Sequence, residues 1–232
     1  MINDKWAAWG NRRKIMSYEF VPKSEYQPVR VELETIIRKV QKLTQRNFTF
    51  QYQLVGSGKR HLITREKNGN KGFDFDYNLI LNCNPGYYWE AESAKKVLMD
   101  AFDKAIAGTI YSHPEDSKTA ITIKVKDNKK SGIKYSCDFA IIYYPELDDD
   151  EEPYFKYIRN AKKGGNGPYT WEIRKCSRNI DEKLFWLKNN VDDYWNQIRR
   201  EYLKVKNANR DPDKHSFQLY YETINNLYNT YR

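Results

Sequence analysis

The sequence predicts an α+β fold in which a mixed β-sheet is flanked by helices and followed by a helical C-terminal part. In the earlier part of the chain, segments with helical apolar spacing alternate with short strand-like segments. From about residue 180 onwards the pattern is helical, with one polar break at 207–215. We therefore expect a core over residues 1–160 and a helical part over residues 161–232 that closes a cleft against it.

The elements of the core follow from apolar periodicity. The helices carry one apolar stripe, such as Leu33, Ile37 and Val40 in the first, and the strands alternate apolar and polar residues. The segment DNKKSG is a polar turn that makes a hairpin of the last two strands. In chain order the expected elements are a helix at 28–46, strands at 48–56 and 73–81, a helix at about 90–107, and strands at 120–126 and 133–144.

The composition is that of a cored protein with a basic surface. Hydrophobic residues make up 40% and charged residues 31% of the chain, and the formal net charge is +9. A basic chain favours anionic partners such as nucleotides or nucleic acid, but a lysine-rich surface kept for solubility gives the same balance. Charge alone does not decide between these two interpretations.

Cysteine usage and hydropathy predict a cytoplasmic protein with no membrane partner. Cys83, Cys137 and Cys176 lie far apart, with no C-x-x-C spacing or neighbouring histidine that would indicate zinc or a disulfide framework. The first residues contain no apolar leader segment, and no run approaches the length of a membrane span.

The segment GSGKR at 56–60 suggests a nucleotide loop but is not a P-loop. A P-loop requires a glycine where Gln53 stands and a Ser or Thr after the lysine, where Arg60 stands. What remains is a tight turn whose backbone amides and Ser57 hydroxyl suit phosphate oxygens. An ordinary hairpin turn is the alternative.

Three aspartates form the candidate chemical site. Strand periodicity places Asp74 and Asp76 of FDFDY on one face and the aromatic residues on the other. The alternative is a strand whose aromatic face lies in the core and whose two aspartates point into water. However, the apolar residues that follow predict a central strand, where paired carboxylates repel unless a cation neutralises them. Asp138 lies on another expected central strand. Together they make an oxygen-rich site suited to Mg²⁺ or Mn²⁺.

This pattern resembles the polymerase-beta-like nucleotidyltransferase superfamily, and within it the oligoadenylate-synthase and bacterial cyclic-oligonucleotide-synthase (CD-NTase) branch. The resemblance rests on the Gly-Ser turn, the Asp-x-Asp strand and the third aspartate, and it covers roughly residues 30 to 225. It implies that Asp74, Asp76 and Asp138 hold two Mg²⁺ or Mn²⁺ ions. It also implies that Gly56 and Ser57 seat the terminal phosphates of a nucleotide.

The resemblance extends more weakly to the C-terminal helices. YLKVKN and HSFQLYYETI are similar to the segments that hold the donor triphosphate, which implies phosphate contacts for Lys206 and Ser216. Other roles compete with these. Lys204 and Lys206 point in different directions on one helix, so at most one of them reaches a cleft, and both could be solvated. Ser216 fits a helix N-cap.

Other residues have commoner structural roles. Tyr169 and Trp171 offer a base-stacking platform, although packing into the core is the more usual role of such aromatics. His61, His113 and His215 share no spacing that would make them ligands, and surface positions are expected for all three.

The first hypothesis is therefore an enzyme that moves a nucleoside monophosphate from an NTP donor to a hydroxyl acceptor and releases pyrophosphate. The acceptor could be a nucleotide, an RNA end, a small molecule or a protein side chain, and the product a linear or cyclic oligonucleotide. A second hypothesis is a catalytically inactive nucleotide- or RNA-binding module with the same fold. A third is a structural domain with three unrelated aspartates.

Overall fold

The structure is a computed structural model that describes residues 17–82, 89–128, 131–147, 152–162, 167–176, 179–211 and 213–232. Its helices are α1 (Lys23–Thr44), α2 (Gly56–Lys59), α3 (Ala91–Ile106), α4 (Asn179–Asn190), α5 (Tyr194–Ala208) and α6 (Ser216–Tyr231). Its strands are β1 (Tyr18–Phe20), β2 (Phe50–Val55), β3 (Thr64–Glu66), β4 (Phe73–Leu81), β5 (Glu115–Asp116), β6 (Ile121–Asp127), β7 (Gly132–Tyr143), β8 (Tyr154–Asn160) and β9 (Tyr169–Lys175).

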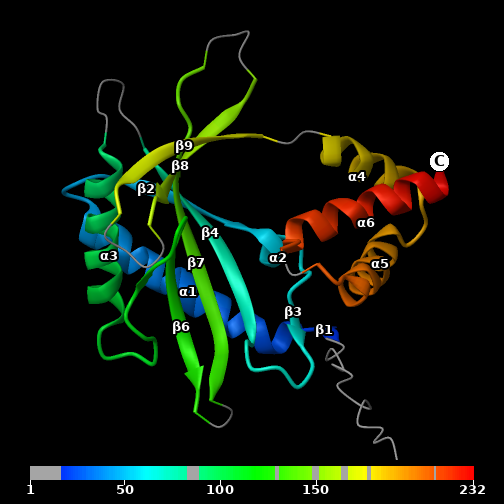
Figure 1. The fold of residues 1–232 in the computed structure, drawn as a ribbon, viewed down its shortest axis with the longest axis horizontal. Coiled ribbons are helices and arrows are strands. Elements are labelled where there is room, and N and C mark those ends of the chain that lie inside the picture. Colours follow the sequence, from blue (N-terminus) through cyan, green and yellow to red (C-terminus); the bar gives the residue numbers. More distant parts are fainter. Residues whose placement is uncertain are drawn as a thin grey trace, which may run out of the picture.

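The described strands form a large mixed sheet and a small ribbon. The large sheet has seven strands with the order β2-β4-β7-β6-β5, and β8 and β9 extend it from β7 (Figure 1). β4 and β7 are parallel, whereas β6 and β7 are the predicted antiparallel hairpin. β1 and β3 make the separate ribbon. The predicted α+β class with a mixed sheet is confirmed, and β4 is a central strand as expected.

One face of the sheet is covered by α1 and α3. The apolar stripes of these two helices are buried in one cluster with the inward residues of β4, among them Phe75 and Tyr77. Alternate residues of β4 therefore point away from the helices, and these are the positions of the two aspartates. The packing of α1 and α3 thus decides which face of the sheet remains for chemistry.

The first helix begins earlier than predicted. Its start was expected at Pro28, but α1 begins at Lys23 and contains Pro28 within it. Proline near the beginning of a helix removes one backbone donor, and that cost is tolerated when packing favours the turn before it. Here Tyr26 is buried, and its ring packs edge-on against Phe75 at a centroid distance of 6.4 Å.

The C-terminal helices have a core of their own. Residues of α4, α5 and α6 make a second cluster of buried side chains with Leu62, and Figure 1 shows these helices beside the sheet, next to α2 and β3. They begin at Asn179 rather than at residue 161, because β9 pairs with β8 and still belongs to the sheet. Whether the two parts are separate domains stays a prediction.

Two further features concern the cysteines and the helices. Cys137 is buried and Cys176 exposed, both as free thiols, while Cys83 lies outside the described residues. Within the described ranges, every helix is too short or too polar to cross a bilayer.

Candidate active site

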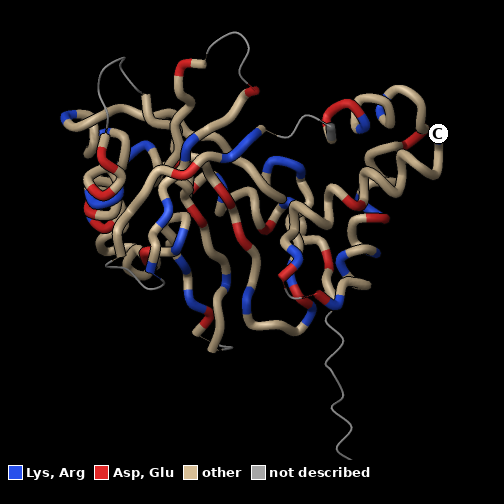
Figure 2. The backbone as a smooth tube through the Cα atoms, turned by 45° about the horizontal axis from the view of Figure 1, so that its top comes forward, with Lys and Arg blue, Asp and Glu red and all other residues tan. Residues whose placement is uncertain are grey.

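The three aspartates lie on one face of the sheet, at the junction of β4 and β7. Asp74 and Asp76 alternate with buried aromatic residues, as the sequence predicts. Asp76 is the register partner of Asp138 in the parallel pair, so the two side chains project to the same side. Figure 2 shows acidic positions along the central strands, and both acidic and basic positions recur over the rest of the chain. The expected placement on one face is observed, while a separation short enough to share cations and the chemical role of the three residues stay predictions.

The Gly-Ser turn lies directly against Asp76. It is not a hairpin turn, because β2 pairs with β4 and the residues from Gly56 form the short helical turn α2. Gly56 has a φ of +60°, and a Cβ atom there would stand 2.2 Å from Asp76 Oδ2. Only glycine allows both this backbone conformation and this close approach. Ser57 follows it at the mouth of the site, where it lines the pocket.

A pocket of about 290 Å³ separates the sheet from the C-terminal helices. The sheet side contributes Asp74 and Asp76, and α2 contributes Gly56 and Ser57. The helical side contributes Tyr202, His215, Ser216, Phe217 and Tyr220. The cleft predicted between the core and the helices is therefore present, and carboxylates, hydroxyls and aromatic rings line it.

Lys206 faces the carboxylates and Lys204 does not. The Lys206 ammonium donates to Ser216 Oγ at 3.4 Å and lies 4.9 Å from the centroid of the Tyr18 ring. Its charge interacts with Asp74 across the cleft. Lys204 is exposed and donates to Glu201 at 3.2 Å on its own helix. Of the two lysines, the one implied by the resemblance is the one that points toward the site.

Ser216 is not the N-cap of α6, which corrects that alternative. His215 holds the N-cap position, and its backbone N–H donates to Gln218 Oε1 at 2.7 Å in a capping box. Ser216 is therefore the first helical residue, and its hydroxyl accepts from Lys206. His215 is exposed, as expected, and it also lines the pocket.

Crowding and burial disfavour the ionised form of the carboxylates. Burial, then repulsion by Asp74 and Asp138, raises the pKa of Asp76 to about 7. Burial likewise raises the pKa of Asp74, partly offset by Lys206. Asp74 is accessible to water, yet it lies in a recess where protein atoms displace much of the bulk solvent.

Asp138 and Lys206 show the same effect of desolvation. Burial raises the pKa of Asp138, against the hydrogen bond from Thr122 and the charge of Lys124. For Lys206, burial lowers the pKa, and the attraction of Asp74 opposes this. A site that raises the pKa of three carboxylates favours the approach of positive charge.

The donor set fits a hard cation, although the carboxylates do not form a closed cage. Among the described residues, no group of three or more His, Cys, Asp or Glu side chains already surrounds one point as a metal site. Mg²⁺ takes only oxygen ligands and is bound typically by one or two carboxylates together with substrate phosphates. Three crowded carboxylates beside an open pocket match that requirement.

Arg60 is a site residue that sequence reasoning missed. Its guanidinium donates to the Gly56 carbonyl at 2.8 Å and stacks over Tyr220 at 4.6 Å from the ring centroid. It also lies 5.5 Å from the centroid of the Phe217 ring. Arg60 thereby joins α2 to α6 across the pocket and brings positive charge near Asp76. Its position three residues after Ser57, inside the turn, was the available signal.

The aromatic platform lies elsewhere than at Tyr169 and Trp171. The Tyr169 hydroxyl bonds to Asp116 at 2.5 Å, and the Trp171 indole donates to the Trp89 carbonyl at 2.8 Å. Both pack against the main core, so the packing alternative is observed. The other two histidines are exposed: His113 pairs with Asp103, and His61 lies near the Tyr26 hydroxyl.

No family model matches the sequence, and no curated protein matches it. Solved structures do match its fold. A Vibrio cholerae DncV variant in complex with ATP and GTP has a TM-score of 0.60 at 11% identity, covering 91% of this chain and 69% of that one. The 3'-deoxy ATP bound form of the same enzyme gives 0.59 at 12% identity, covering 91% and 68%. The GTP bound form gives 0.58 at 13% identity, covering 91% and 67%.

The chain shares the fold of these DncV structures. Another DncV structure is described as a cyclic AMP-GMP synthase and a prokaryotic cGAS homolog, with a TM-score of 0.51 at 12% identity. It covers 83% of this chain and 61% of that one. The present chain thus spans about two thirds of the length of the DncV structures it matches.

Proposed function

We propose that this protein transfers a nucleoside monophosphate from an NTP donor to a hydroxyl acceptor and releases pyrophosphate. The observation that carries the proposal is the placement of Asp74, Asp76 and Asp138 on one face of the sheet, beside a glycine turn and a pocket. The solved structures of the same fold contain ATP or GTP, which supports an NTP as donor.

Two divalent ions, Mg²⁺ or Mn²⁺, would supply charge neutralisation at the transferring phosphoryl group and would acidify the attacking hydroxyl. Asp74 and Asp76 would hold both ions, and Asp138 would complete the site of the catalytic one. The crowding of the three carboxylates supports a cation site here, because repulsion among them is relieved by cations.

The residues of the chain have distinct roles in the transfer. The acceptor oxygen forms a bond to the α-phosphorus, the bond between that phosphorus and the bridging oxygen breaks, and pyrophosphate leaves. Asp138 helps to draw the proton from the acceptor hydroxyl. Ser57 and the Gly56 turn seat the outer phosphates, and Ser216 of the opposite wall contacts them together with Lys206, which donates to the Ser216 hydroxyl.

The deciding experiment incubates the protein with each α-labelled NTP and Mg²⁺ or Mn²⁺, alone and with nucleotide, RNA, aminoglycoside-like and protein acceptors. We expect metal-dependent pyrophosphate release together with a labelled product, and loss of both in the Asp76→Asn variant. Separation of the products identifies a linear, cyclic or single-transfer outcome. NTP binding without pyrophosphate release under every condition would contradict the proposal and favour the inactive binding module.

A further inference from the structure

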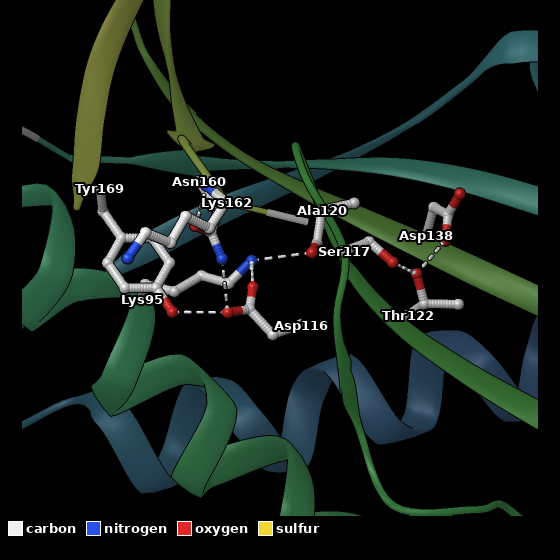
Figure 3. A network of polar contacts seen from close by, with 9 residues as sticks. All are labelled: Lys95, Asp116, Ser117, Ala120, Thr122, Asp138, Asn160, Lys162 and Tyr169. Carbon is white, nitrogen blue, oxygen red and sulfur yellow. Dashed lines mark hydrogen bonds and ion pairs between the residues drawn. The ribbon is translucent and has the colours of Figure 1, made fainter. Parts of the chain in front are cut away.

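Asp138 is held by a threonine on the next strand. Thr122 of β6 lies directly opposite Asp138 in the antiparallel pair with β7. Its hydroxyl donates to Asp138 Oδ1 at 2.5 Å, and the threonine is only 6% exposed (Figure 3). Within the described residues, no hydrogen bond engages the other carboxylate oxygen, Oδ2. Thr122 therefore fixes one oxygen of Asp138 and leaves the second for a ligand.

A second hydroxyl supports the first in a defined direction. Ser117 Oγ lies 2.7 Å from Thr122 Oγ1. A hydroxyl carries a single proton, and Thr122 donates its proton to the Asp138 carboxylate. Ser117 must then be the donor to Thr122, so the two hydroxyls form a short chain directed at Asp138.

The turn that carries Ser117 is held by a hydrogen bond from a buried lysine. The backbone N–H of Ser117 donates to the Ala120 carbonyl at 3.1 Å, and Lys95 Nζ donates to the same carbonyl at 2.7 Å. Lys95 comes from α3, is 3% exposed and pairs with Asp116 at 2.9 Å. A buried charge of this kind is retained only where partners surround it, so the turn is held rigidly.

Asp116, the ion-pair partner of Lys95, also bonds to residues of β8 and β9. Asp116 Oδ2 accepts hydrogen bonds from Asn160 Nδ2 at 3.0 Å and from the Tyr169 hydroxyl at 2.5 Å. Figure 3 shows this cluster and the Ser117–Thr122–Asp138 chain as two parts of one polar network. Elements α3, β8 and β9 thus stabilise the turn next to the aspartate on β7.

We propose that Thr122 is a positioning residue for nucleotidyl transfer, with Ser117 as its support. By holding Oδ1, the Thr122 hydroxyl selects the Asp138 orientation in which Oδ2 serves the acceptor side of the reaction. This inference rests on the function proposed above. Thr122 does not line the donor pocket, so its effect should fall on the rate of transfer and not on NTP binding.

The test compares Thr122→Val, which keeps the branched shape but removes the hydroxyl, with Thr122→Ser, which keeps the hydroxyl. We expect Thr122→Val to lower kcat about 10- to 100-fold, since a hydrogen bond to a charged group is lost, with the KM for NTP within about 3-fold. Thr122→Ser should stay within about 3-fold of wild type. Ser117→Ala should give a smaller loss, about 2- to 5-fold.

A matched control is Thr64→Val on β3, which removes another buried strand hydroxyl. In the described part of the chain the Thr64 hydroxyl has no hydrogen-bond partner, so kcat should not change. An equal loss in Thr122→Ser and Thr122→Val would overturn the proposal, because packing and not the hydroxyl would then be responsible. An unchanged kcat in Thr122→Val would also overturn it.

A readout independent of turnover separates this inference from the proposed function. Crystal structures of the Thr122→Val and Thr122→Ser variants should show a turned Asp138 carboxylate in the first and the wild-type orientation in the second. If the protein transfers no nucleotide, the proposed function fails while this comparison still reports on Asp138. An unchanged Asp138 in Thr122→Val would show that the hydroxyl does not position it.

Discussion

Asp76 of β4 and Asp138 of β7 are register partners in the one parallel strand pair among the described strands of the large sheet. They are distant in the sequence, yet the pairing brings their side chains to the same face, next to the Gly56 turn. The repulsion between them raises the pKa of Asp76, after the larger effects of burial and of Asp74. Most of the expected behaviour of the site follows from this pair.

Replacing Asp76 should separate activity from stability. Asp76→Asn should reduce nucleotidyl transfer at least ~100-fold, because it removes a carboxylate needed to hold cations at the reacting phosphate. The same change should raise the Tm of the metal-free protein by about 2–6 °C, because it removes repulsion among carboxylates. Transfer assays and thermal unfolding in EDTA measure the two effects.

Asp100→Asn is the control, since it alters an exposed carboxylate on α3. It should change neither transfer nor Tm. Full transfer activity in Asp76→Asn would refute the role assigned to this residue.

The metal-free protein should be more stable at pH 5 than at pH 8. The pKa of Asp76 is raised from 3.8 to about 7, so between these values the folded state binds a proton that the unfolded state has lost. Stability from that proton is complete below pH ~4 and is lost as the pH rises through ~7. We expect a difference of about 1–2 kcal/mol, because solvent reaches the site through the pocket.

Urea unfolding in EDTA at the two pH values measures this difference in wild type and in Asp76→Asn. The variant should show a smaller change, and Asp74 and Asp138, whose pKa values are shifted in the same direction, should account for the remainder. A pH dependence identical in both proteins would rule out Asp76 as the source.

Gly56→Ala should disable the site more than a strained backbone alone can explain. Its Cβ would meet Asp76 Oδ2 at 2.2 Å, and the residue has a φ of +60°. Gly108 provides the matched comparison, with a φ of +73° and nothing within 4 Å of an added Cβ. Gly108→Ala should cost about 1 kcal/mol in the free energy of unfolding and leave ATP affinity unchanged.

For Gly56→Ala we expect a larger loss of stability and a drop in ATP affinity of about 10-fold or more, measured by calorimetric titration. The same stability cost and the same affinity in both variants would show that the contact with Asp76 has no consequence.

Lys206→Ala should weaken ATP binding about 10-fold, while Lys204→Ala should leave it unchanged. Lys206 points toward Asp74 and Ser216, and Lys204 pairs with Glu201 in solvent. A cation in the cleft makes charge-assisted contacts with phosphate that an exposed lysine cannot make. Titration of ATP into both variants measures the difference, and undiminished affinity in Lys206→Ala would place this lysine outside the binding site.

The sequence alone determined the local chemistry of the site. Period-2 alternation in FDFDY was enough to place Asp74 and Asp76 on the face opposite Phe75, because successive strand side chains point to opposite sides. Gln53 and Arg60 excluded a P-loop, and the sequence correctly predicted a turn at this place. That the turn is helical and not a hairpin turn became clear only from the pairing of β2 with β4.

Tertiary structure decided everything that depends on how distant segments dock. The register of β4 on β7 set Asp138 beside Asp76, and the docking angle of α5 turned Lys206 inward and Lys204 outward. Residues with no distinctive local pattern, such as Arg60, Thr122 and Lys95, acquired their roles from contacts across the fold. Periodicity reports the direction of a side chain relative to its own backbone. The partners it meets are set by long-range packing, which no local pattern encodes.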